Sequence, residues 1–222
     1  MPFSPADFFS VFEQYNTTVW PAQLALVMVG TATVILAVIS TPRASIAASI
    51  LLALLWIWMG VGYHLAFFSA INPLAPVFAA AFIAQGMLLL VAGGWRRQIK
   101  LQFHADGASI TGALIIAYAL IGYPLLGHML GHRYPATPTF GVPCPTTIFT
   151  FGVLVLAKPP VSRALLVIPC LWAVTGTIAA HTLGMYEDLG LPIAALIAVG
   201  IVLARGRRLA VDVIQPLKPG AA

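Results

Sequence analysis

The chain has 222 residues, of which 60% are hydrophobic and only 8% charged, and its mean hydropathy is +0.97. A soluble domain carries about a quarter charged residues, so this composition excludes a soluble globular protein. The net charge of +5 does not indicate a nucleic-acid partner, because the basic residues lie at the ends of hydrophobic runs. The sequence therefore predicts an all-α, multi-span protein whose surroundings are the lipid bilayer.

The first twenty residues predict a short helix lying at the membrane interface. Ser4, Pro5 and Asp7 form the pattern of a capped helix start, and apolar residues follow at helical spacing until Trp20-Pro21. An ordinary lead-in to the first span is the alternative. The expected organisation is an interfacial helix at 1–20, a single transmembrane domain at 21–208 and a cytoplasmic tail at 209–222.

Seven hydrophobic runs are separated by prolines, glycines and charged residues, as expected for a bundle of about seven transmembrane helices. The expected spans are 21–40, 44–70, 77–94, 108–131, 146–157, 161–183 and 189–204. The fifth run is short for a bilayer, and it follows a proline-rich elbow. That elbow predicts rigid, non-helical backbone that either covers a pocket or acts as a structural plug.

The distribution of Lys and Arg predicts the orientation of the chain. With seven spans, ten of the 11 basic residues fall on one side, and only Arg133 falls on the other. Basic residues favour the cytoplasmic side, so the amino terminus is expected outside and the carboxyl terminus in the cytoplasm. The shared side carries Arg43, Arg96, Arg97, Lys100, Lys158, Arg163, Arg205, Arg207, Arg208 and Lys218.

Four of the five histidines fall in one depth zone near the outer surface under this topology. They are His64, His128, His132 and His181. Polar groups are costly inside a bilayer, so their clustering predicts that they satisfy one another or a bound species. His128 and His132 are four residues apart, which places both side chains on one face of a helix, where they can share a metal.

These four histidines predict a metal site that would suit zinc first, then copper or iron, including haem iron. Glu13, Glu187 and Asp188 are the candidate catalytic acids or bases beside it. The corresponding function is a metal-dependent membrane enzyme, a hydrolase acting on a lipid-like substrate. Histidines that only bridge loops and water are the structural alternative.

Other functions remain open at this stage. A small-solute transporter or permease-like subunit would use the outer polar zone as a vestibule, although neither an internal repeat nor a charged residue near the midplane supports it. A redox subunit would bind haem or quinone, and a structural membrane subunit would use its histidines only for packing. The sequence does not choose between a homo-oligomer and a complex with another membrane protein.

Three segments carry a resemblance to a known family: FFSVFEQYNTTVWPAQ, GYHLAFFSAINP and GHRYPATPTFGVPCPTTIFTFG. Together they resemble a bacterial family of small multi-span proteins, the domain of unknown function DUF6064. The resemblance implies an integral protein of the bacterial cytoplasmic membrane and carries over no catalytic residue. The chain is more distantly similar to seven-span zinc hydrolases of the alkaline ceramidase and adiponectin-receptor type, but its histidine pair lies in the fourth helix rather than the last.

Overall fold

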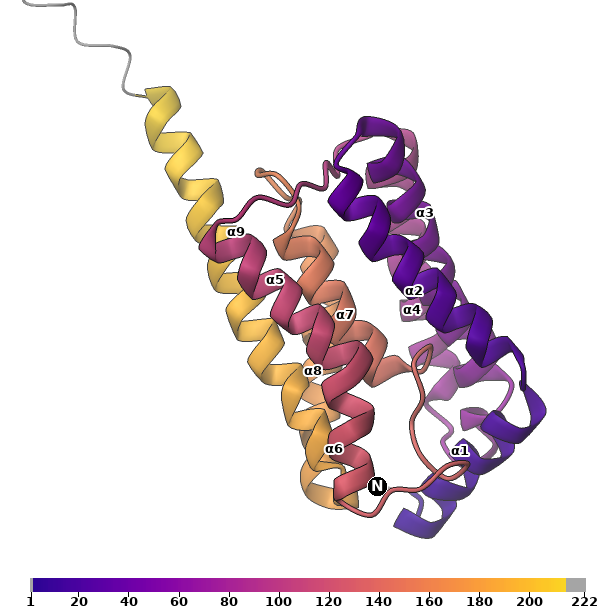
Figure 1. Ribbon diagram of the computed structural model, residues 1–222. Helices are drawn as coiled ribbons and strands as arrows, with labels where there is room; N and C mark the ends of the chain where they lie inside the picture. Colours follow the sequence, from indigo (N-terminus) through magenta and orange to yellow (C-terminus); the bar gives the residue numbers. More distant parts are fainter. Residues whose placement is uncertain (1, 215–222) are drawn as a thin grey trace, which may run out of the picture.

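The computed structural model describes residues 2–214, with side chains as far as Arg208, and confirms the all-α architecture (Figure 1). The helices are α1 (Pro5–Thr18), α2 (Ala22–Ile39), α3 (Pro42–Trp58), α4 (Ala75–Leu89), α5 (Gly107–Ala117), α6 (Tyr123–Met129), α7 (Pro143–Val155), α8 (Ala164–Leu183) and α9 (Gly190–Ile214). Shorter helical turns are η1 (Met59–Leu65), η2 (Phe68–Ala70), η3 (Leu90–Trp95), η4 (Tyr118–Gly122) and η5 (Tyr186–Leu189).

Six of the expected spans are helices long and apolar enough to cross a membrane within the described residues. Their bounds are Ala22–Ile39, Pro42–Ala70, Ala75–Trp95, Gly107–Met129, Ala164–Leu183 and Tyr186–Arg208. The protein is therefore a multi-pass membrane protein. Helix α9 continues to Ile214, into the segment expected to be a tail.

The remaining run, the fifth along the chain, forms α7, which is a short helix at the centre of the bundle. Its 13 residues span about 20 Å, less than the roughly 30 Å of a hydrocarbon core. Every residue of α7 except Cys144 is buried, and α5, α8 and α9 pack around it. A helix enclosed by other helices meets no lipid, so its length and its threonines need not fit the bilayer.

The bundle has two ends, which we name by the helices found there. Helix α1 lies across one end, the α1 end, and α9 finishes at the opposite end, the α9 end (Figure 1). Residues 130–142 leave α6 at the α1 end, pass beside α1 and return to the start of α7 (Figure 1). This is the expected non-helical elbow, and it connects the α1 end to the start of the short helix α7.

Two glycines allow α5 and α7 to approach each other closely. A Cβ atom on Gly112 would lie 2.9 Å from the carbonyl oxygen of Gly152, and a Cβ on Gly152 would lie 2.8 Å from that of Gly112. Small residues of this kind let helix backbones meet in membranes, where packing rather than the hydrophobic effect drives association. A hydrogen bond from Trp56 Nε1 to Thr150 Oγ1 (2.9 Å) links α3 to the same central helix.

The capping motif expected at the start of α1 is confirmed. Ser4 Oγ accepts a hydrogen bond from the Asp7 amide, and the Asp7 carboxylate accepts one from the Ser4 amide. Ser4 Oγ and the Ser4 amide both donate to the Asp7 carboxylate, and these bonds to its charged form lower the pKa of the exposed Asp7 carboxyl. Helix α1 buries Phe8, Phe12 and Tyr15 against the bundle, so it covers the α1 end rather than lying free on the surface.

Candidate functional site

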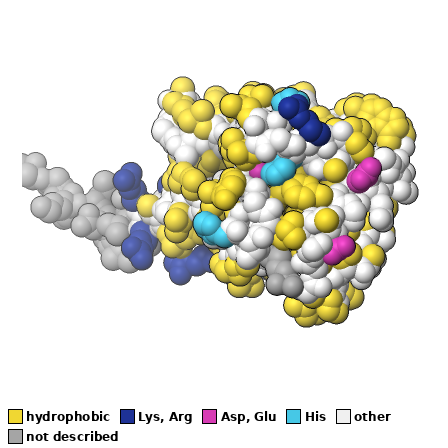
Figure 2. All heavy atoms as spheres, turned by 90° about the horizontal axis from the view of Figure 1, so that it is seen from below, with side chains coloured by type: hydrophobic (Ala, Val, Ile, Leu, Met, Phe, Trp, Pro, Cys, Tyr) yellow, Lys and Arg dark blue, Asp and Glu magenta, His cyan; other side chains and the backbone are white. Residues whose placement is uncertain are grey.

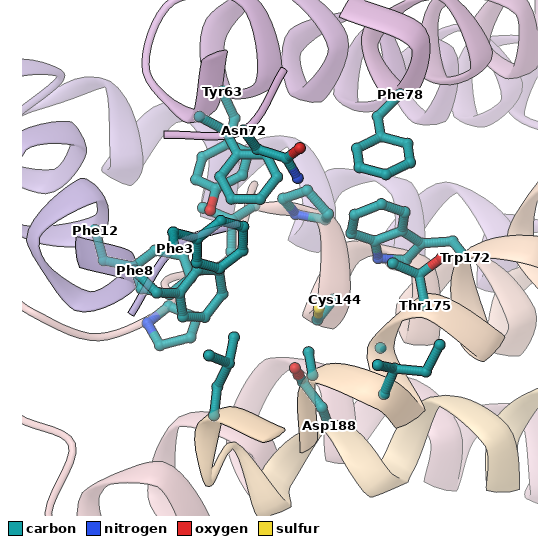
Figure 3. A pocket seen from close by; sticks show the side chains of 18 of the residues that line it. Phe3, Phe8, Phe12, Tyr63, Asn72, Phe78, Cys144, Trp172, Thr175 and Asp188 are labelled. Carbon is teal, nitrogen blue, oxygen red and sulfur yellow. The ribbon is translucent and has the colours of Figure 1, made fainter. Parts of the chain in front are cut away.

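A cavity of about 220 Å³ lies beneath α1, and its walls are almost entirely apolar (Figure 3). Aromatic rings from five elements form most of it: Phe8 and Phe12 from α1, Tyr63 from η1, Phe68 from η2, Phe78 from α4 and Trp172 from α8. The rings pack edge to face or stacked, with centroids 4.9 Å apart for Phe8 and Phe12 and 5.5 Å apart for Phe78 and Trp172. Such contacts form a firm, preformed wall.

The polar groups in the wall are few, and one of them is a carboxyl group. Asp188 lines the cavity, where its side chain lies near that of Cys144 (Figure 3). Tyr123 Oη donates a hydrogen bond of 2.6 Å to Asp188 Oδ1. Asn72 also lines the cavity and is held in place because its Oδ1 accepts from the Leu74 amide (3.0 Å). The cavity is therefore an apolar chamber with hydrogen-bonding groups at defined points.

The cavity reaches the surface beside α4 and α8, and also at Pro2 before the start of α1. Leu74 and Ile178 line it and are 56% and 50% exposed on the outside of the bundle, so they form its rim. The outward face of α8 around the rim is apolar, because Leu171 and Val174 are also exposed. In a multi-pass membrane protein such a surface faces lipid, so the mouth of the cavity lies on the lipid-facing surface.

The cover over the cavity is fixed by polar contacts of α1. Asn16 is fully buried and donates from Nδ2 to the carbonyl oxygens of Pro135 (2.6 Å) and Thr137 (2.7 Å) in the elbow. Trp58 Nε1 donates to Tyr15 Oη at 2.8 Å. Burial raises the pKa of Tyr15 to about 12, so this hydroxyl stays protonated at neutral pH. Helix α1 and the elbow thus form one continuous lid.

The structure brings two of the predicted site residues into direct contact beside the cavity. His132 Nδ1 lies 2.7 Å from Glu187 Oε1, and the Glu187 side chain is fully buried. Tyr118 Oη donates to the backbone oxygen of Glu187 at 2.8 Å, which fixes the turn that carries both acids. The side chains of Glu187 and Asp188 therefore have different surroundings: Glu187 contacts the histidine of the elbow and Asp188 lines the cavity.

His64 lies in an aromatic enclosure next to the cavity. Both of its ring nitrogens are buried and have no hydrogen-bond partner. Its ring centroid is 4.7 Å from that of Phe82 and 5.2 Å from that of Trp172. These rings separate His64 from the other predicted ligands.

The remaining predicted residues do not converge on one point. His128 is exposed and hydrogen-bonds Arg133, His181 is exposed near the end of α8, and Glu13 is exposed on α1. Figure 2 shows the histidine atoms at separate places on the α1 end, one of them beside acidic atoms and all of them among hydrophobic ones. Within the described part of the chain, no group of three or more His, Cys, Asp or Glu side chains could hold a metal. The arrangement gives no support to a metal on the four histidines, which stays a prediction.

The aromatic residues of the cavity are what sequence reasoning missed. Phe78 and Trp172 each sit in a hydrophobic run and look like ordinary membrane-helix side chains. The available signal was the concentration of aromatic residues in 1–20 and 56–82, which packing brings together around one space.

Comparison with known proteins supports the sequence resemblance. Neither the curated proteins nor the solved structures gave a match. A family model described as a family of unknown function (DUF6064) matches residues 6–212, which include the residues that line the cavity except Pro2 and Phe3. The chain therefore belongs to the DUF6064 family.

Proposed function

We propose that this protein binds a lipid-like molecule in the cavity beneath α1. The observation that carries this proposal is an apolar cavity whose rim lies on the lipid-facing surface. A ligand dissolved in the bilayer could enter between α4 and α8 without crossing water. Ligand pockets that enclose whole drug-sized molecules measure about 300–1,000 Å³, so a cavity of about 220 Å³ holds only the end of such a molecule. The rest would extend past Leu74 and Ile178 into the membrane.

Asp188 indicates which end of the ligand enters. Asp188 Oδ1 already accepts from Tyr123 Oη, and a carboxylate has lone pairs for further donors. The inserted end should therefore carry a donor, and a primary amine suits both the acid and the surrounding rings, because aromatic faces attract cations. A lipid whose head group is a protonated amine combines these features.

Lipid retained by the purified protein tests the proposal. Thr175→Trp places a large side chain in the cavity, and Val174→Trp places the same side chain one residue away on the lipid-facing surface. The wild type and Val174→Trp should retain about one lipid per protein through delipidation, and Thr175→Trp should retain roughly tenfold less, a change of about 1.4 kcal/mol. Mass spectrometry of the extracted lipids measures this.

The same extraction tests the role of Asp188. Asp188→Asn keeps an oxygen that accepts from Tyr123 but replaces the negative group. Lipids with an ethanolamine head group should be enriched over the bulk membrane in the wild type, and the enrichment should disappear in Asp188→Asn. Equal retention in Thr175→Trp and Val174→Trp would contradict binding in the cavity. Unchanged enrichment in Asp188→Asn would contradict only the amine.

The proposed orientation places the cavity in the outer leaflet of a bacterial cytoplasmic membrane. The support is the distribution of charge: within residues 2–208, the basic residues other than Arg133 lie on segments toward the α9 end, opposite the cavity. A reporter protein fused after Lys158 should be active on the cytoplasmic side, and one fused after Arg133 should be active on the outer side. The reverse result would place the cavity in the inner leaflet.

A metal-dependent hydrolase acting on the bound lipid is a further prediction. The His132–Glu187 pair beside the cavity is the arrangement that favours acid–base chemistry there. Elemental analysis of the gently purified protein, with His128→Ala and His132→Ala together as the comparison, distinguishes it from simple binding. One equivalent of metal that is lost in the double variant would support the enzyme.

A further inference from the structure

A second hollow lies at the opposite end of the molecule, and its charged lining is entirely basic. It measures about 730 Å³ and includes Arg96, Arg97, Lys100 and Lys158. We call it the basic groove. Arg97 and Lys100 also line an adjoining hollow together with Arg43, so the positive surface continues towards the start of α3. The cavity beneath α1 shares no residue with this groove.

The fold holds the cations of the groove close together. Residues 96–106 cross the α9 end between η3 and α5 and pair with the chain that follows α7. Leu101 and Ala157 form an antiparallel bridge, and the Lys158 amide donates to the Lys100 carbonyl oxygen at 2.7 Å. Ile99 and Leu101 are buried, so Lys100 points outward beside Lys158. Like charges on paired segments repel each other, so this pairing is unfavourable unless an anion lies between them.

The groove provides no anion of its own. The structure records no ion pair for its four cations within residues 2–208, where side chains are described. The nearest acid along the crossing segment, Asp106, instead caps α5 and accepts from the Ser109 amide at 2.8 Å. This hydrogen bond lowers the pKa of the Asp106 carboxyl. The carboxylate therefore serves as the cap of α5 and not as the anion of the groove.

Arg97 adopts a backbone conformation that favours glycine. Its φ is +53°, in the left-handed region, which costs free energy for any residue with a Cβ. Glycine would fit this turn without strain. We therefore expect the arginine side chain to have a role that offsets the cost of this backbone conformation. The guanidinium group has planar donors that match phosphate oxygens and is the side chain best suited to recognise them.

The level of the groove relative to the bilayer indicates which kind of molecule carries the anion. One candidate span ends at Trp95 and another begins at Ala164, on either side of the groove. Trp95 is 86% exposed, and exposed tryptophan side chains favour the level of the lipid head groups. The groove therefore opens where phospholipid phosphates lie, and basic hollows between helices at this level suit anionic head groups.

We propose that the basic groove binds the head group of an anionic phospholipid through its phosphate. Arg97 and Lys158 form the central contacts from the two facing segments, and Arg96 and Lys100 add charge beside them. A head group with two phosphates, such as that of cardiolipin, suits four cations better than one with a single phosphate. This inference is independent of the ligand beneath α1.

Native mass spectrometry of the full-length, delipidated protein tests this site. The probes are cardiolipin, phosphatidylglycerol and phosphatidylcholine, each added in neutral detergent, and inorganic phosphate as a competitor. For the wild type, the apparent Kd of cardiolipin should be at least about tenfold lower than that of phosphatidylcholine. Arg97→Gly with Lys158→Gln should abolish this preference. Arg97→Gly also relieves the strained φ, so the loss should occur without a lower thermal midpoint.

A charge-matched variant provides the control. Arg207→Gln with Arg208→Gln removes the same two positive charges from exposed positions on α9 and should keep the preference for cardiolipin. Equal loss in both double variants would overturn the site in favour of general electrostatic attraction. Cardiolipin binding unchanged by Arg97→Gly with Lys158→Gln would also overturn it. Displacement of cardiolipin by millimolar inorganic phosphate would show that the groove binds free phosphate rather than lipid.

Discussion

Asn16→Asp should strongly destabilise the fold, although it changes one amide to a carboxylate of the same shape. The amide nitrogen donates to two carbonyl oxygens of the elbow, and Asp has no donor to replace it. The side-chain oxygen still accepts from Thr139 Oγ1 (3.0 Å), but the second oxygen now faces two carbonyls in a buried place. Unpaired buried groups and an uncompensated buried charge should together cost about 3–5 kcal/mol.

Thermal unfolding in detergent, followed by tryptophan fluorescence, measures this loss. The expected fall in the midpoint is roughly 10 °C for a chain of this size. Gln14→Glu makes the same chemical change at an exposed position on α1 and should stay within about 0.5 kcal/mol of the wild type. Similar midpoints for the two variants would show that Asn16 does not hold the lid.

Gly152→Ala should destabilise the bundle, although alanine is the better helix former by about 1 kcal/mol. The added methyl group would lie 2.8 Å from the Gly112 carbonyl oxygen and 3.1 Å from the Ile116 backbone nitrogen. Neither atom belongs to a flexible side chain, so α5 and α7 must move apart. Overpacking of this kind costs about 1–3 kcal/mol, and the hydrogen bond from Trp56 to Thr150 on α7 would be strained as well.

Gly200→Ala on α9 is the control, since nothing lies within 4 Å of an added Cβ there. It should be neutral or slightly stabilising in the same unfolding measurement. If both variants unfold at the wild-type midpoint, the contact between α5 and α7 is looser than the structure describes.

The sequence predicted the elements of this fold well, because hydropathy and proline positions control them. The run expected at 21–40 is α2 (Ala22–Ile39), and the capped helix near Ser4 is α1. Periodicity could not show that α7 (Pro143–Val155) is enclosed by other helices. A central helix and a lipid-facing helix are both apolar, and only tertiary packing distinguishes them.

The candidate site was predicted only in part, for a similar reason. Sequence reasoning selects histidines and acids by their chemistry and grouped His132 with Glu187, and the structure places these two side chains in contact. It also placed Asp188 near the site, where the structure shows it in the cavity wall. The aromatic wall was missed because Phe78 and Trp172 are 94 positions apart and differ in nothing from their apolar neighbours.

The enclosure of α7 has a consequence for how the chain is made. A helix of about 20 Å that begins with Pro143 and carries buried threonines is stabilised little by contact with lipid alone. Its stabilising neighbours α8 and α9 are synthesised after it. During synthesis, the elbow and α7 can therefore reach their final packing only after the last two helices have been made.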